Sequence, residues 1–132
     1  MDAGITKWNL RPRKIKGSPY LQSLDVAQLR EKGIDLVNFM SLREQSKYKY
    51  IINVDGHVSA FRLSIELGMK SVILLVKSDW KIWYSDMLIP YKHYVPIRSD
   101  LSNLLDQIRW CRANDDKCQE IAKNAYEFFE TY

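Results

Sequence analysis

The stretch of residues 48–68 constrains the fold more than any other part of this sequence. Residues 48–54 (YKYIINV) are rich in β-branched and aromatic side chains and too short for a free-standing helix, which predicts a strand buried on most of its surface. Asp55-Gly56, which tolerates positive φ, ends that strand. From Val58 onward the apolar residues recur at helical spacing, and Gly68 suits the end of the helix. The stretch therefore predicts a buried strand, a tight turn and a helix.

The predicted helix, residues 58–67, has two apolar sides and one polar stripe. Its apolar sides are Val58, Phe61 and Ile65 and, nearly opposite, Ala60, Leu63 and Leu67; the polar stripe is Ser59, Arg62 and Glu66. This pattern predicts a helix that lies between two layers of the protein.

A buried strand, a tight turn and a helix together favour an anion site. The turn leaves backbone N–H groups and the positive end of the helix at the carboxyl end of the strand, where phosphates bind. Arg62 adds a guanidinium suited to bidentate contact with a phosphate. Two other interpretations stay open from these residues alone. Asp55-Gly56 is also a common hairpin turn, and Arg62 with Glu66 also fits a surface i,i+4 pair.

The rest of the sequence predicts a parallel sheet covered on both faces. Residues 71–76 and 93–97 are the next two predicted strands, residues 80–88 are a predicted helix between them, and Pro96 is expected near the end of its strand. Two C-terminal helices follow. The first has Leu101, Leu104, Leu105, Ile108 and Cys111 at helical spacing behind a Ser99-Asp100 cap. The second begins at Asp115 or Asp116 and buries Ile121, Ala122, Ala125, Tyr126 and Phe129.

The N-terminal part lacks a sustained period. Residues 1–24 are predicted to be mostly loop, Asp25 to cap a short helix over residues 26–32 closed by Gly33, and residues 37–45 to form a further short turn. We therefore expect N-terminal loops and short helices over residues 1–47, a Rossmann-like region over residues 48–132, and a single domain overall.

Composition excludes several classes of protein. With 132 residues, 46% of them hydrophobic and 27% charged, the chain has the make-up of an ordinary globular protein. The longest apolar run, residues 72–76, is far too short to span a bilayer. We see no signal peptide and no retention signal, so the compartment is not predicted. Cys111 and Cys118 are expected to be buried free thiols.

The charge raises the question of nucleic acid. The net charge is +4 and the isoelectric point about 9.0, with basic residues concentrated in residues 7–16. Acidic residues are interleaved elsewhere, and no recognised nucleic-acid module accompanies the charge. A solvated basic loop is therefore favoured, and nucleic-acid binding is the lesser alternative.

Motifs for common cofactors are missing from the sequence. There is no G-x-G-x-x-G and no P-loop. His57 and His93 lack acidic or histidine neighbours at ligand spacing, so no metal site is expected. The aromatic residues between Trp80 and Tyr94 suit either base stacking or a core.

Several motifs in a fixed order resemble one family. They are MDAGIT (1–6), YKYIINVDG (48–56), VSAFRL (58–63), Trp83-Tyr84, Leu88, Pro90, HYVPIRSDLS (93–102) and IAKNAYEFF (121–129). Over nearly the whole chain they resemble the CAP10-like glycosyltransferases of family 90, which include protein O-glucosyltransferases, capsule-associated xylosyltransferases and relatives in large DNA viruses.

The resemblance implies an inverting GT-B enzyme whose C-terminal, Rossmann-like half holds a nucleotide sugar, with a UDP-sugar as the expected donor. This chain is similar to that half only. Arg62 matches the arginine that contacts the donor pyrophosphate, and the expected donor-binding residues are Asp55, Gly56, Ser59, Ala60, Phe61, Arg62 and Trp80. The chain departs from the family pattern at Lys77, where many members have aspartate, and at Ile82, where many have glutamate.

The resemblance also implies what the chain lacks. Family members carry a catalytic carboxylate on the N-terminal acceptor half, which nothing here matches, so no catalytic residue is assigned and little activity of the chain alone is expected. The implied partners are a UDP-sugar and a protein or glycan acceptor, with a separate acceptor-binding half as a further option and no metal cofactor. The alternative is a non-catalytic nucleotide-binding or partner-binding module of a truncated or split enzyme.

Overall fold

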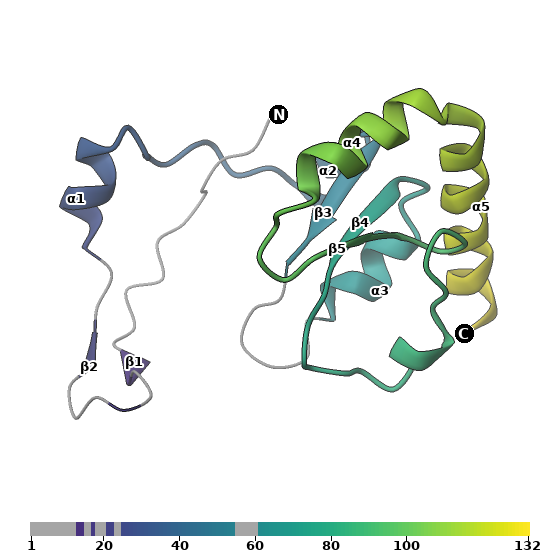
Figure 1. Cartoon of the computed structure of the whole chain (residues 1–132), viewed down its shortest axis with the longest axis horizontal. Coiled ribbons are helices and arrows are strands. Elements are labelled where there is room, and N and C mark those ends of the chain that lie inside the picture. Colours follow the sequence, from purple (N-terminus) through teal and green to yellow (C-terminus); the bar gives the residue numbers. More distant parts are fainter. Residues whose placement is uncertain (1–12, 15–16, 18–20, 23–24, 55–60) are drawn as a thin grey trace. The chain divides into compact units, whose positions relative to one another are not determined.

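A computed structural model describes residues 13–14, 17, 21–22, 25–54 and 61–132 of the chain, which divides into two units, Met1–Ser41 and Leu42–Tyr132 (Figure 1). The predicted turn at Asp55-Gly56 and the first predicted helical residues, 58–60, lie outside the described residues. The predicted boundary after residue 47 and the single domain stay predictions.

The first unit holds short elements. Strand β1 (Arg13–Lys14) pairs antiparallel with β2 (Leu21–Gln22), and helix α1 spans Val26–Glu31. The Asp25 carboxylate accepts a hydrogen bond from the Gln28 N–H at 3.2 Å, which confirms Asp25 as the N-cap. Gly33, with φ of 74°, follows the helix as predicted.

The second unit begins with the short helix α2 (Leu42–Gln45) and is built on a parallel sheet. Its strands are β3 (Tyr50–Asn53), β4 (Val72–Val76) and β5 (Val95–Ile97), in the order β3-β4-β5. Both strand pairs are parallel. The three predicted strands are confirmed, each beginning one or two residues later than expected.

Helices cover both faces of this sheet (Figure 1). Val72, Leu74 and Val76 of β4 pack with α4 (Leu104–Ala113) and α5 (Asp115–Thr131) in one core cluster. Ile73, which points to the opposite face, packs with Leu63 and Leu67 of α3 (Arg62–Leu67) in a second cluster. The predicted α/β fold, a Rossmann-like parallel sheet with flanking helices, is confirmed.

Helix α3 buries only one of its two apolar sides. Leu63 and Leu67 are buried, whereas Phe61 and Ile65 are 77% and 46% exposed. Glu66, predicted on a polar surface stripe, is instead 1% exposed. The prediction of a helix between two layers is wrong for these residues, because Glu66 turns toward a polar partner on β3 and the opposite side faces solvent.

The segment after β4 is not the predicted helix over residues 80–88. Within it lies only a 3-10 turn, η1 (Ser85–Met87). The Trp80 N–H donates to Ser78 Oγ and the Ile82 N–H to Ser85 Oγ, both at 2.9 Å. The N–H groups of Ser85, Met87 and Leu88 bond the carbonyl groups three residues earlier rather than four, so the segment forms tight turns instead of an α-helix.

Two further helix predictions need correction. Helix α4 begins at Leu104, later than the predicted Ser99-Asp100 cap implies. The Asp100 carboxylate accepts a hydrogen bond from the Ser102 N–H at 3.0 Å and Leu101 has a φ of 61°, so these residues form a turn before the helix. Helix α5 begins at Asp115 as predicted, but Phe129 is 43% exposed. Cys111 and Cys118 are buried free thiols, as expected, and burial raises the pKa of Cys111 to about 12.

Pro96 was predicted near the end of its strand but lies in the middle of β5. The Ile97 carbonyl accepts a hydrogen bond from the Lys77 N–H at 2.8 Å, so the polar backbone groups of Ile97 face β4. Because successive residues of a strand face opposite directions, the backbone of Pro96 faces away from β4. Its missing N–H therefore costs this sheet no hydrogen bond.

Candidate functional site: a basic cavity at the carboxyl ends of the strands

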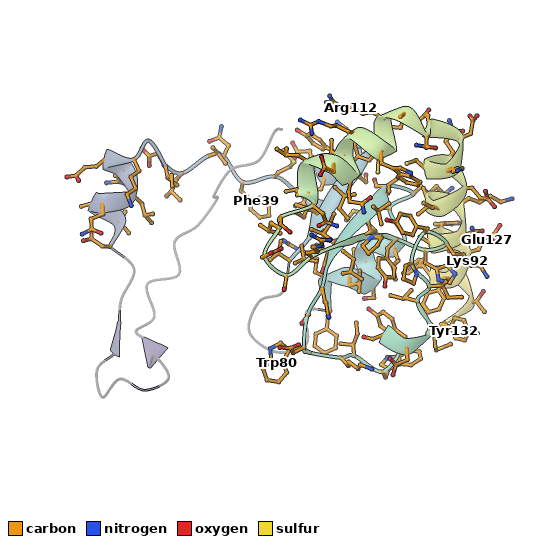
Figure 2. All side chains as sticks on the ribbon, viewed as in Figure 1. Phe39, Trp80, Lys92, Arg112, Glu127 and Tyr132 are labelled. Atoms are coloured by element: carbon orange, nitrogen blue, oxygen red, sulfur yellow. The ribbon has the colours of Figure 1, made fainter. Side chains whose placement is uncertain are left out.

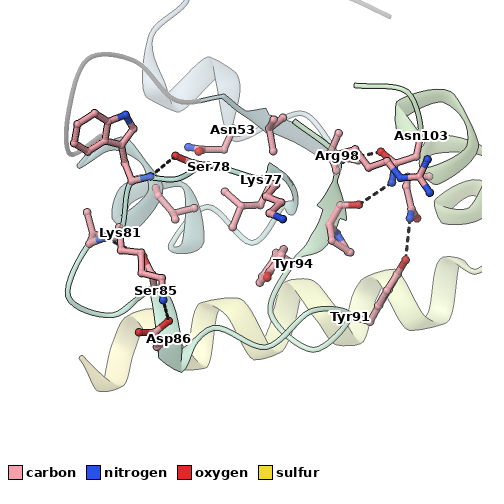
Figure 3. A pocket seen from close by; sticks show the side chains of 18 residues that line it. Asn53, Lys77, Ser78, Lys81, Ser85, Asp86, Tyr91, Tyr94, Arg98 and Asn103 are labelled. Carbon is pink, nitrogen blue, oxygen red and sulfur yellow. Dashed lines mark hydrogen bonds and ion pairs between the residues drawn. The ribbon is translucent and has the colours of Figure 1, made fainter. Parts of the chain in front are cut away.

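A cavity of about 550 Å³ opens at the carboxyl ends of all three parallel strands (Figure 3). Asn53 at the end of β3, Lys77 just after β4 and Arg98 just after β5 line it. Ligands of open α/β sheets bind at this edge, because loops there surround a crevice beyond the strand ends. The cavity is therefore the leading candidate for a binding site.

The far wall comes from the irregular segment after β4 and from α4. Ser78, Trp80, Lys81 and Asp86 line it from the first of these, and Asn103 and Gln107 from the second. The Gln107 amide donates to the Tyr91 hydroxyl at 2.8 Å, and the Arg98 N–H donates to Asn103 Oδ1 at 2.8 Å. These bonds fasten α4 to the segments that precede and follow β5 (Figure 3).

The cavity carries an excess of positive charge. Lys77, Lys81 and Arg98 line it together with one described carboxylate, that of Asp86. Lys81 Nζ lies 2.6 Å from Asp86 Oδ1, so these two charges offset each other. Among the described residues, neither Lys77 nor Arg98 forms an ion pair within 4.0 Å, although the hydrogen bonds from Ser102 and then the charge of Arg98 lower the pKa of Asp100, and Arg98 Nη1 donates to Ser102 Oγ at 3.4 Å. Two cations remain to attract an anion.

Trp80 supplies an aromatic surface at the cavity. Its side chain is 62% exposed, and Figure 2 shows it at the lower edge of the second unit. The bond from its N–H to Ser78 Oγ holds the backbone there while leaving the indole uncovered. An exposed indole beside a cavity is suited to stacking on a planar or sugar ring.

Glu66 joins Arg62 to the cavity wall. Its Oε2 accepts a hydrogen bond from Asn53 Nδ2 at 2.7 Å, and its Oε1 lies 3.8 Å from Arg62 Nε. Burial raises the pKa of Glu66, while the Asn53 hydrogen bond and the Arg62 charge oppose that rise. The i,i+4 pair considered from the sequence does exist, but its carboxylate is buried rather than on the surface.

The predicted site residues are distributed unevenly. Trp80 lines the cavity. Phe61 and Arg62 are among the described residues but do not line the cavity. Asp55, Gly56, Ser59 and Ala60 lie outside the described residues. Lys77 and Ile82, noted as departures from the family pattern, both line it. The donor-binding role of each residue stays a prediction.

Sequence reasoning missed several cavity residues that a simple rule would have found. Asn53 ends β3 and Arg98 directly follows β5, the positions where parallel sheets gather functional side chains. Asn103 and Gln107 gave no such signal, because their place depends on where α4 begins.

Other chemistries receive no support from the described residues. In the parts of the chain that the structure describes, no three His, Cys, Asp or Glu side chains lie close enough to hold a metal ion. Within those same parts, no helix combines the length and apolar character needed to cross a membrane.

Fold and cavity together define an α/β protein of the Rossmann-like class with a basic site at the carboxyl edge of its sheet. Comparison with known proteins then identifies the family. The model of Glycosyl transferase family 90 matches residues 7–132, and the chain belongs to that family.

Its relatives include viral and animal proteins. The chain is 56% identical to Uncharacterized protein 179R of Invertebrate iridescent virus 6 over 137 residues, which cover 98% of this chain and 11% of that protein. It is 58% identical to Uncharacterized protein 035R of Invertebrate iridescent virus 3, covering 100% of this chain and 12% of the relative. It is 40% identical to Protein O-glucosyltransferase 2 of Danio rerio over 97 residues, 74% of this chain and 19% of the relative. The chain thus spans less than a fifth of each of these relatives.

Proposed function

We propose that this chain is the nucleotide-sugar-binding part of an inverting CAP10-like glycosyltransferase, with a UDP-sugar as donor. The observation that carries the proposal is the basic cavity at the carboxyl edge of the sheet, lined by Lys77, Arg98 and Trp80. In the proposed enzyme a hexose or pentose passes to a hydroxyl group of a protein or glycan.

The chemistry of the cavity supports this kind of ligand. A nucleoside diphosphate carries several negative charges, which the cations Lys77 and Arg98 in the cavity wall attract. An exposed indole offers a stacking surface for a base or a sugar. The chain's family includes relatives named as O-glucosyltransferases, which supports a glycosyl donor over other diphosphates.

Arg62 is the proposed pyrophosphate contact. It is the first residue of α3, one position after Phe61, and its side chain is 63% exposed. Its guanidinium is therefore accessible to a ligand, and the resemblance of residues 58–63 to the family motif supports this role. We also propose that the chain corresponds to the C-terminal half of a GT-B enzyme, so that the acceptor binds mainly to another half.

Calorimetric titration of the chain with UDP and UDP-glucose tests the proposal. Replacing both Lys77 and Arg98 by Ala should weaken UDP binding at least tenfold, because each charge-assisted contact contributes about 1.5–3 kcal/mol. The matched control Lys117→Ala removes one exposed positive charge from α5, away from the cavity, and should leave the affinity unchanged. Absence of binding at millimolar nucleotide, or equal losses in the control and the double variant, would contradict the proposal.

A further inference from the structure

Asn53 and Glu66 form a buried pair beside the cavity. Asn53 is 3% exposed and Glu66 is 1% exposed, and Asn53 Nδ2 donates to Glu66 Oε2 at 2.7 Å. An ionised carboxylate offers only hydrogen-bond acceptors. The Asn53 amide must therefore turn its NH2 group toward Glu66, so its orientation follows from the chemistry of the pair.

This orientation decides what Asn53 presents to a ligand. The amide oxygen lies on the branch opposite Nδ2, and Asn53 is one of the residues that line the cavity (Figure 3). Its cationic neighbours in the wall, Lys77 and Arg98, bring side-chain donors. With Nδ2 engaged by Glu66, Oδ1 is the acceptor atom that Asn53 can offer to a ligand in a cavity lined by the cationic donors Lys77 and Arg98.

We propose that Glu66 is a positioning residue that holds Asn53 as the hydrogen-bond acceptor for a hydroxyl group of the bound nucleotide sugar. This rests on the proposed function. The hydroxyl belongs either to the ribose or to the transferred sugar, and the experiment below separates these two sources.

The geometry predicts what happens in the variant Glu66→Gln. Arg62 Nε lies 3.8 Å from Oε1, and its positive charge favours keeping the oxygen of the new side-chain amide on that side. The NH2 group of that amide then replaces Oε2 and faces Asn53, which must turn its own oxygen inward to accept. Glu66→Gln therefore reverses the Asn53 amide and leaves its NH2 group toward the cavity.

The test measures binding of UDP-glucose and of analogues in which one ribose or glucose hydroxyl at a time is replaced by fluorine. Fluorine cannot donate, so one analogue should bind the original chain at least fivefold more weakly than UDP-glucose. We call the ratio of the affinity for UDP-glucose to the affinity for that analogue the preference. In Glu66→Gln this preference should fall toward one. A fluorinated ribose that shows the effect identifies the ribose hydroxyl, and a fluorinated glucose identifies the sugar.

The preference cancels the contribution of Arg62, because all probes carry the same diphosphate. The matched control Glu120→Gln, an exposed position on α5, should keep the preference of the original chain. Asn53→Ala removes the acceptor and should also equalise the probes, which provides a second variant if Glu66→Gln folds poorly.

Two outcomes overturn the inference while leaving the proposed function intact. One is that every fluorinated analogue binds the original chain as well as UDP-glucose does. The other is that the preference persists unchanged in Glu66→Gln and Asn53→Ala. Absence of binding by all probes would reject the proposed function, and this inference with it.

Discussion

The ring of Phe129 on α5 lies against the backbone of Gly68 at the end of α3. A Cβ atom at residue 68 would lie 3.0 Å from two carbons of that ring, Cδ1 and Cε1. Gly68 has a φ of −76°, which any residue adopts, so glycine is required here for space rather than for backbone freedom. This contact lets α3 and α5 approach closely.

Gly68→Ala should therefore destabilise the chain by about 1–3 kcal/mol, because the added methyl group overpacks the contact. In a Phe129→Ala background the same change should become stabilising by about 0.4–1 kcal/mol, since it restricts the unfolded chain without a clash. Urea unfolding of the four variants measures the coupling. The same sign in both backgrounds would show that Phe129 moves aside at no cost.

Glu66→Gln should stabilise the fold increasingly as pH rises. Burial raises the pKa of Glu66 above the model-peptide value of 4.5, so the folded chain holds this proton more tightly than the unfolded chain. Ionisation of Glu66 therefore costs stability as pH rises from about 4.5 through its raised pKa. Gln has the same shape without that charge.

Urea melts of the original chain and Glu66→Gln between pH 4 and pH 8 measure this difference, with Glu120→Gln as the exposed control. A gap between original and Glu66→Gln that stays constant, or that widens toward low pH, would contradict the pKa argument.

His93 should make the fold sensitive to mild acid. The imidazole is buried, and its Nδ1 accepts a hydrogen bond from the Ile89 N–H at 3.0 Å. Burial, and then the charge of Lys92, lower the pKa of His93 below 6.5. The unfolded chain thus binds this proton first, so stability is complete above pH 6.5 and is lost as pH falls through the lowered pKa.

Unfolding free energies of the original chain and His93→Gln at pH 5 and pH 7.5 test this. The original chain should lose more stability between these two pH values than His93→Gln does. Equal losses would place the acid sensitivity elsewhere.

The chain by itself should bind its donor without transferring sugar. Among the described residues that line the cavity, Asp86 supplies the carboxylate, and it is engaged by Lys81 at 2.6 Å. A general base typically contributes a factor of about 10²–10⁴, which this cavity would then lack. Incubation with labelled UDP-glucose and a panel of proteins and glycans should give no product above that of the Lys77→Ala, Arg98→Ala double variant. Transfer that disappears in that variant would reveal a general base within the chain.

The sequence predicted the sheet well because hydrophobic runs report burial directly. Residues 71–76 and 93–97 contain β4 and β5, and Asp25 signalled the start of α1 through its capping chemistry. Local sequence patterns fail to predict burial where a residue distant in the sequence provides the contact. Glu66 belongs to the polar stripe of its own helix, but Asn53 on β3 draws it into the interior.

The cavity illustrates the same limit. Trp80 was among the expected donor-binding residues, whereas Gln107 lines the cavity only because α4 begins at Leu104. In the predicted helix over residues 80–88, the N–H groups of Ser85, Met87 and Leu88 instead bond carbonyl groups three residues earlier, and the sequence pattern alone did not distinguish these turns from an α-helix.

The outward-facing backbone of Pro96 has a consequence for how this sheet can grow. A further strand laid along the outer side of β5 would find no donor at Pro96, whereas the outer side of β3 contains no proline. Proline in a strand at the edge of the described sheet thus protects against unintended pairing between molecules. It also directs any additional strand, from a longer polypeptide or a second molecule, to the side of Tyr50–Asn53.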